Sequence, residues 1–134
     1  MNATTPSLNI YDASAGSGKT FTLVKEYLKK ILLVDSTDYY KQILAITFTN
    51  KAVGEMKKRI VEQLVAFADE KSIEAPGDMQ KLLAEEVKLS HSVIQERSKQ
   101  ILRHLLHDYS GFSVETIDKF NHRIIRSFAK DLKL

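Results

Sequence analysis

The chain has 134 residues, enough for one domain with a modest core, and its 43% hydrophobic and 28% charged residues are typical of a soluble globular protein. It has no cysteine, which excludes disulfides, thiol catalysis and cysteine-bound metals. The net charge of +3 is mild, no apolar run is long enough to span a membrane and no secretion signal is present, so we expect a cytoplasmic protein.

The N-terminal part predicts a strand, a glycine-rich turn and a helix in succession. The strand is expected over Leu8–Ala13 and the helix over Thr20–Val34, where apolar residues recur with helical spacing. The turn between them has the composition of a phosphate-binding loop and reads Ala13, Ser14, Ala15, Gly16, Ser17, Gly18, Lys19 and Thr20.

The chemistry of this loop suits a nucleotide. Gly16 and Gly18 allow several backbone N–H groups to converge on one anion, and the following helix adds its positive end. Lys19 can reach the β- and γ-phosphates, and the Thr20 hydroxyl can ligate Mg²⁺. The general pattern has glycine where this chain has Ala13, the smallest substitute.

The next elements are a buried strand and an amphipathic helix. Residues Ile43–Phe48 are nearly all apolar, which predicts a strand covered on both faces, as in a parallel sheet. Thr49 or Asn50 is expected to cap the following helix. The apolar stripe of that helix comprises Val53, Met56, Ile60, Leu64 and Phe67.

Residues from about 70 to 110 predict a helical excursion. Asp69–Asp78 is the least constrained stretch, and a helix then runs to about Leu89. Ser92 followed by Gln95 resembles a capping box, so a second helix is expected to start there. The four histidines, His91, His104, His107 and His122, show no zinc-site spacing, and we expect them on helix surfaces.

A third strand over Phe112–Ile117 completes the pattern, and Asp118 is expected to cap a last helix. The apolar face of this helix comprises Phe120, Ile124, Phe128 and Leu132. Strands that alternate with helices predict an α/β fold with a parallel sheet, flanking helices and right-handed crossovers. The phosphate-binding loop then lies at the carboxyl edge of the sheet.

Polar and basic residues follow the second and third strands at this same edge. They are Thr47, Phe48, Asn50 and Lys51 after one strand, and Thr116, Lys119, Phe120 and Arg123 after the other. Hydroxyls, amides and cations suit a phosphate backbone, and the two phenylalanine rings could stack on unpaired bases. The alternative interpretation is that the rings belong to the core and the cations form a solvated helix face.

Together, and in this order, the motifs resemble UvrD/Rep-type superfamily 1 DNA helicases. Residues 13–20 are similar to motif I of the RecB and AddA branch, which also opens Ala-Ser-Ala-Gly. Residues 46–60 resemble motif Ia, and residues 114–120 resemble a later Thr-Ile-His-Ser-Phe motif, with Asp118 and Lys119 in place of its histidine and serine.

The resemblance implies that residues 1–134 form an incomplete N-terminal ATP-binding domain of the RecA-like P-loop type, from a longer helicase or translocase. It implies ATP and Mg²⁺ as cofactors, with Lys19 and Thr20 as catalytic residues. Single-stranded DNA would lie along the strand ends named above. The implied partners are the remainder of the helicase chain and a nuclease subunit or domain in DNA repair, without a membrane.

One expected part of the machinery is absent. Hydrolysis needs an acidic pair after an apolar strand, and no such pair is found. We therefore expect the chain by itself to bind Mg·ATP without turnover, and its incomplete sheet to leave edges that favour association. Two other functions stay open from the residues: a small-molecule phosphotransferase, or a non-catalytic remnant that binds nucleotide or DNA.

Overall fold

The computed structural model describes residues 18–133, with side chains from residue 20. Its helices and strands are α1 (Gly18–Leu33), β1 (Leu44–Thr47), α2 (Asn50–Ala68), α3 (Asp78–Val87), α4 (His91–His107), β2 (Ser113–Thr116) and α5 (Ile117–Asp131). Three short 3-10 turns cover Tyr39–Gln42, Glu70–Ile73 and Tyr109–Gly111. The predicted strand over Leu8–Ala13 and the loop residues Ala13–Ser17 lie outside this description.

The helix starts follow from side-chain caps, and two of them differ from the sequence prediction. Thr49 caps α2 as expected, because its hydroxyl accepts a hydrogen bond from the Ala52 N–H at 3.0 Å. Ser90, not Ser92, caps α4, and Thr116, not Asp118, caps α5. In both cases the cap is the last residue with extended backbone, and β2 runs into α5 without a loop that would bring Asp118 to the cap position.

The sheet has two parallel strands in the part of the chain that the structure describes. β1 and β2 pair in register from Leu44 opposite Ser113 to Thr47 opposite Thr116. The expectation that β1 is covered on both faces is wrong. Leu44 and Ile46 are 38% and 39% exposed, because the helical layer covers only the other face, where Val114 is buried.

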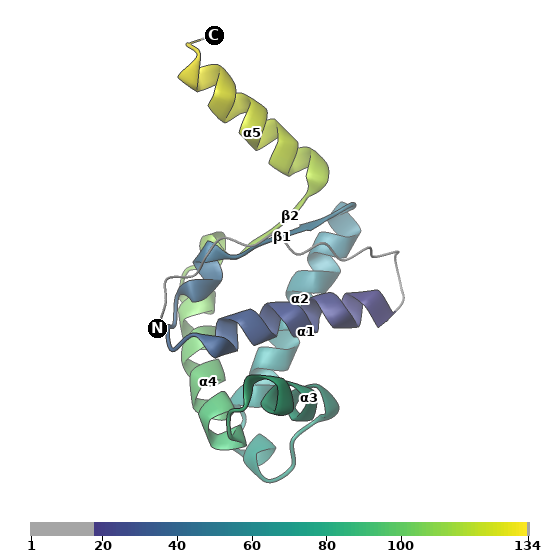
Figure 1. The fold of residues 1–134 in the computed structure, drawn as a ribbon, viewed down its shortest axis with the longest axis vertical. Coiled ribbons are helices and arrows are strands. Elements are labelled where there is room, and N and C mark those ends of the chain that lie inside the picture. The colour runs from purple at the N-terminus through teal and green to yellow at the C-terminus, as the bar shows by residue number, and fades with distance from the viewer. Residues whose placement is uncertain (1–17, 134) are drawn as a thin grey trace.

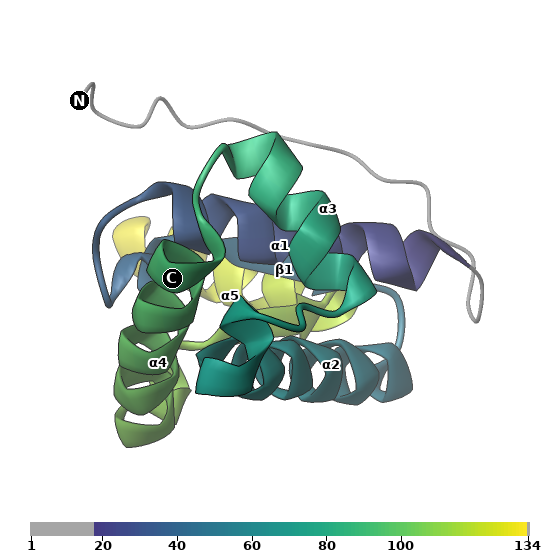
Figure 2. The ribbon, with the colours of Figure 1, turned by 90° about the horizontal axis from the view of Figure 1, so that it is seen from below.

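Helices α1 to α4 form a body on one side of this sheet, and α5 projects from the other side (Figures 1 and 2). The core joins all four helices of the body; its fully buried members include Leu28, Ile31, Ile60, Leu64, Leu83, Ile94 and Leu105. Helix α5 contributes no buried residue. No helix in residues 18–133 is long and apolar enough to cross a membrane.

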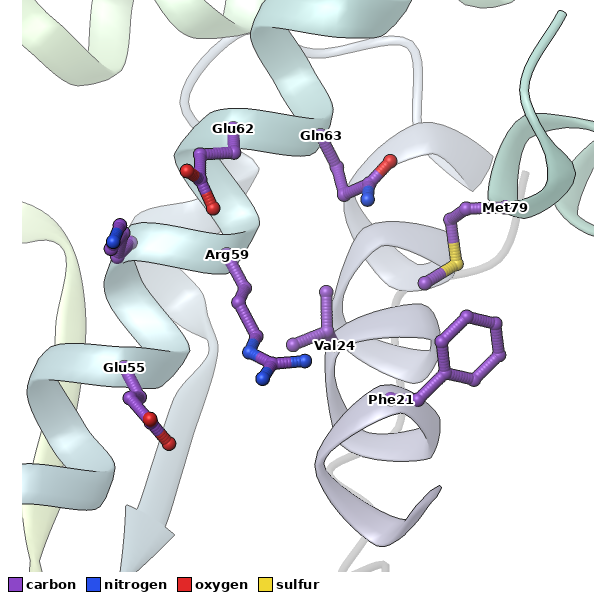
Figure 3. A pocket seen from close by; sticks show the side chains of 8 residues that line it. Phe21, Val24, Glu55, Arg59, Glu62, Gln63 and Met79 are labelled. Carbon is purple, nitrogen blue, oxygen red and sulfur yellow. The ribbon is translucent and has the colours of Figure 1, made fainter. Parts of the chain in front are cut away.

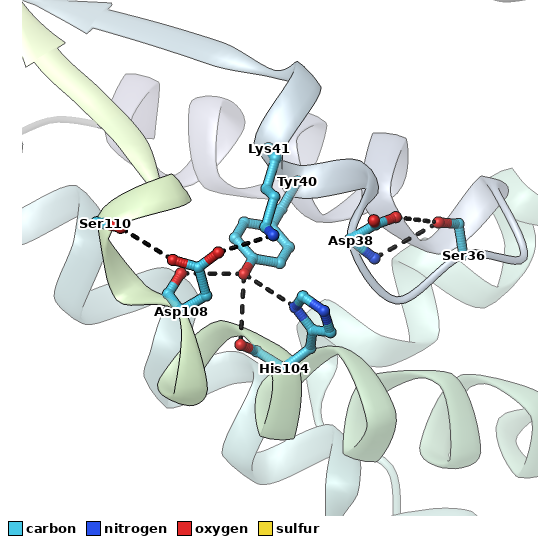
Figure 4. A network of polar contacts seen from close by, with 7 residues as sticks. All are labelled: Ser36, Asp38, Tyr40, Lys41, His104, Asp108 and Ser110. Carbon is cyan, nitrogen blue, oxygen red and sulfur yellow. Dashed lines mark hydrogen bonds and ion pairs between the residues drawn. The ribbon is translucent and has the colours of Figure 1, made fainter.

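A polar network closes the body at the end away from the start of α1 (Figure 4). The buried Tyr40 hydroxyl lies 3.1 Å from His104 Nδ1 and donates to the Asp108 carbonyl, while Lys41 forms a 2.7 Å ion pair with Asp108. Hydrogen bonding to Lys41 lowers the pKa of Asp108. His104 therefore anchors α4 and is not a solvated surface residue as expected.

Of the other three histidines, one is anchored by a side-chain contact and two are exposed. His91 is half-buried, with its Nδ1 3.3 Å from the side-chain nitrogen of Gln80, whereas His107 and His122 are exposed as predicted. Among the described residues, no group of three or more histidines and acids could hold a metal ion.

Candidate functional site

Helix α1 begins at the end of the predicted phosphate-binding loop. Gly18, Lys19 and Thr20 form its first turn, and Thr20 is half-buried. This turn holds no acidic residue, so the positive end of the helix dipole is not neutralised there. Val24 and Leu28 fix the helix in the core. The remaining predicted nucleotide ligands, Ala13–Ser17, lie outside the described residues.

The carboxyl ends of both strands lie on the same side of the molecule as the start of α1 (Figures 1 and 2). Because Thr47 and Thr116 are paired, the two chain segments that follow them leave the sheet side by side. Parallel pairing therefore brings together the two groups of residues that the sequence proposes for DNA, about 70 positions apart.

The two phenylalanines differ in exposure. Phe48 is 72% exposed, far more than a core ring, so its solvated ring is available to stack on a base. Phe120 is half-buried at the start of α5, and the Arg123 guanidinium lies 5.7 Å from its ring centre. The core interpretation is thus excluded for Phe48, while Phe120 has one face occupied.

Two of the proposed threonines have their hydroxyls engaged within the loops. Thr116 is 8% exposed, and its hydroxyl accepts from the Lys119 N–H at 3.1 Å. The half-buried Thr47 hydroxyl donates to the Thr49 carbonyl at 3.3 Å. These hydrogen bonds fix the backbone conformation of the loops, so Thr47 and Thr116 have a structural role at the edge. Asn50, Lys51 and Lys119 are exposed on its surface.

The cations at this edge are also not equivalent. Arg123 forms a 2.7 Å ion pair with Glu115, an acid that the sequence analysis did not single out. Within the described residues neither Lys51 nor Lys119 has an ion-pair partner, so both can neutralise a ligand phosphate. Successive side chains of the strand sequence Ser-Val-Glu-Thr alternate between the two faces of the sheet. This alternation is the sequence signal that places Glu115 on the face away from the buried Val114.

A groove of about 290 Å³ lies between α1 and α2, close to the start of α1 (Figure 3). Phe21 and Val24 line it from α1, and the Arg59 side chain extends into it from α2. Glu55 and Glu62 flank Arg59 by one turn on either side, yet neither forms an ion pair with it among the described residues. No pattern along the sequence reveals this groove, because it depends on how α1 packs beside α2.

Comparison with known proteins shows to which family this chain belongs. Residues 2–134 match the family described as the UvrD/REP helicase N-terminal domain. The chain belongs to this family. The expected family is therefore confirmed, and a mostly helical chain with a small parallel sheet is consistent with part of such a helicase domain.

Several relatives in the same family are named as one subunit of an ATP-dependent helicase/nuclease. The protein from Lactobacillus johnsonii is 34% identical over 119 residues, which cover 89% of this chain and 8% of the relative. That from Bacillus mycoides is 39% identical over 93 residues (68% and 7%), and that from Bacillus cytotoxicus is 34% identical over 116 residues (87% and 7%). The chain thus spans less than a tenth of these relatives. No solved structure matches it.

Proposed function

We propose that this chain is the N-terminal ATP-binding part of a DNA helicase or translocase, within a RecA-like P-loop domain that contains a helical insertion at about residues 70–110. The observation that carries the proposal is the shared edge: the start of α1 and both strand ends, with Phe48 72% exposed, lie on one side of the molecule. The relatives' names, which join a helicase to a nuclease, support a role in DNA processing.

In the nucleotide half of the edge, residues 13–20 would cradle the phosphates of ATP. Lys19 would face the β- and γ-phosphates, and Thr20 would hold Mg²⁺. The described strands are not followed by an acidic pair that could orient the attacking water, so we expect this chain to bind Mg·ATP or Mg·ADP and to hydrolyse neither.

In the DNA half, Phe48 would stack on a base, and Asn50, Lys51 and Lys119 would contact the phosphate backbone. Thr47 and Thr116 would hold the loops in shape, and Phe120 with Arg123 would border the track. The rest of a longer helicase polypeptide, a nuclease partner or domain, and a cytoplasmic location complete the proposal.

The test measures DNA binding and nucleotide binding, each with variants of its own half of the edge. Binding of a fluorescent oligo-dT should weaken in Phe48→Ala, by up to about 1–3 kcal/mol for a stacked base, and Lys119→Ala should reduce the salt dependence by about one phosphate contact. Lys81→Ala, an exposed lysine on α3, is the matched control and should bind like the wild type. Lys19→Ala should weaken binding of a fluorescent ADP analogue in Mg²⁺.

Two results would contradict the proposed DNA interface, and a third would contradict the expected lack of hydrolysis. Equal DNA affinity in Phe48→Ala, Lys119→Ala and Lys81→Ala would remove the strand ends from the DNA interface. Nucleotide binding that depends on Lys19 in a chain with no DNA affinity would instead support a small-molecule phosphotransferase. ATP turnover that disappears in Lys19→Ala would show that the missing acid is supplied elsewhere in the chain.

A further inference from the structure

Helix α5 carries a row of four cations along one side, here called the basic row. The basic row consists of Lys119, Arg123, Arg126 and Lys130. Successive members are four, three and four residues apart, a spacing that places side chains on one face of an α-helix. All four residues are exposed. The two acids of the helix, Asp118 and Asp131, lie on other faces, so neither interrupts the row.

The charge of the basic row is only partly neutralised. Among the described residues, neither Arg126 nor Lys130 has an ion-pair partner, and the same holds for Lys119. Arg123 differs, because its guanidinium forms a 2.7 Å ion pair with Glu115 on β2. The row therefore offers a ligand three free cations and one that is already paired.

The apolar residues of α5 lie on the opposite side of the helix from the basic row. Ile124 and Phe128, which are 50% and 64% exposed, mark the centre of that side, about half a turn away from Lys119 and Lys130. A segment of a longer polypeptide that covered the apolar side would therefore leave the basic row open to solvent. The row can be assigned a ligand of its own.

The basic row continues the edge at which the strands end. It begins at Lys119 in the first turn of α5, which follows β2 directly, and it runs outward as α5 projects from the body (Figure 1). Lys119 and Lys130 are separated by roughly 16 Å along the helix axis, at about 1.5 Å per residue. An acidic polypeptide would need carboxylates at matching intervals, whereas DNA supplies a phosphate at every nucleotide.

We propose that the basic row of α5 binds the phosphate backbone of single-stranded DNA that continues outward from the strand ends. The inference rests on the proposed function, because it extends the same DNA track beyond Phe48 and Lys119. Arg126 and Lys130 add two phosphate contacts to that track. Glu115 withholds a third, because it neutralises Arg123 in the middle of the row.

Binding of oligo-dT of two lengths tests the extension. An oligonucleotide of about 6 nucleotides is expected to cover the strand ends, and one of about 20 nucleotides also reaches the basic row. Arg126→Ala and Lys130→Ala should each weaken binding of the long oligonucleotide about threefold at low salt and reduce its salt slope by about 0.7. Neither should affect the short one. Arg126→Lys and the control Lys81→Ala should bind both like the wild type.

Removal of the acid provides a gain-of-function test. Glu115→Gln keeps the shape of the side chain and frees Arg123, so the salt slope for the long oligonucleotide should rise by about 0.7. Arg123→Ala should abolish this gain in the Glu115→Gln background and change the wild-type slope little. Glu96→Gln, at an exposed acid of α4, is the matched control and should leave the slope unchanged. Urea midpoints check that each variant is folded.

The outcomes separate this inference from the proposed function. If Phe48→Ala and Lys119→Ala weaken binding of both oligonucleotides, but Arg126→Ala and Lys130→Ala weaken neither, the basic row is not part of the track and only this inference fails. If the wild type binds neither oligonucleotide, the proposed DNA interface fails as a whole.

A competition experiment tests the class of ligand. Poly-glutamate should compete only weakly with the long oligonucleotide, and its effect should not depend on Arg126 or Lys130. Poly-glutamate that displaced the oligonucleotide at an equal concentration of charge, through these two residues, would assign the row to an acidic polypeptide and overturn the inference. A Glu115→Gln slope that Arg123→Ala leaves raised would disprove the role given to Glu115.

Discussion

Helices α2 and α5 are capped in the same way, but their apolar stripes lie in different environments. Each follows a strand of the parallel pair, and each is capped by a threonine hydroxyl that accepts from the N–H three residues later. Both carry an apolar stripe at spacings of three and four residues. In α2 the stripe is buried as Met56, Ile60, Leu64 and Phe67, whereas α5 buries no residue.

The difference teaches that local signals specify a helix without specifying its partner. Capping and amphipathic spacing are equally clear in the two sequences. Helix α2 meets α4 and the strands, so its stripe joins the core, while the direction in which α5 leaves β2 carries it away from the body (Figure 1). The comparison can be tested by changes made in matched positions of the two helices.

The largest difference is expected from removal of an apolar side chain. Leu64→Ala should lower the free energy of unfolding by about 2–5 kcal/mol, because Leu64 is 0% exposed and leaves a cavity. Ile124→Ala should change it by less than about 0.5 kcal/mol, because Ile124 is solvated in the monomer. Urea unfolding at sub-micromolar protein provides the measurement. Equal losses would show that α5 is packed on the body in solution.

A smaller difference is expected from the two caps. Thr49→Ala should cost about 1 kcal/mol and shift the urea midpoint, since α2 unfolds only with the body. Thr116→Ala should instead fray α5, which is seen as lost helical circular dichroism with little shift of the midpoint. If the Thr116 variant shifted the midpoint as much as the Thr49 variant, the independence of α5 would be disproved.

The smallest effect on stability is expected from a decrease in pH. Hydrogen bonds from Lys25 and Lys29 lower the pKa of Glu86 below its ordinary 4.5, so this contribution to the body is complete above pH 4.5 and is lost as pH falls through the lowered value. In Glu86→Gln the decrease of stability between about pH 5 and 3 should be shallower than in the wild type. Urea midpoints across this range measure it. Because these residues join α1 to α3, the helical signal of α5 should not follow the change.

Much of the local structure could be predicted from the sequence. The strand at Leu44–Thr47, the cap at Thr49 and the buried stripe of α2 depend on spacing and side-chain chemistry, which are local. The parallel pairing of strands followed by helices also follows from their order. The exposed Phe48 at a strand end was one of two open interpretations, and its 72% exposure decides between them.

The features that could not be predicted from the sequence depend on tertiary packing. Tyr40 and His104 are 64 positions apart, so no pattern along α4 reveals that His104 is anchored by a tyrosine hydroxyl. The pairing of Arg123 with Glu115 and the exposure of Leu44 and Ile46 depend on where α5 goes after β2. Ser92 and Asp118 had suitable cap chemistry, but the chain enters each helix two residues earlier.

The in-register pairing of β1 with β2 also constrains the order of folding. Leu44 and Ser113 are 69 positions apart, and closure of so long a loop costs chain entropy before any strand bond is gained. Helices α2, α3 and α4 lie between the two strands in the sequence, and their formation reduces the effective length of the loop that must close. We therefore expect the helical body to form first and the sheet to assemble on it late. On this expectation, the edge that carries Phe48 and Lys119 becomes a binding surface only in the last step of folding.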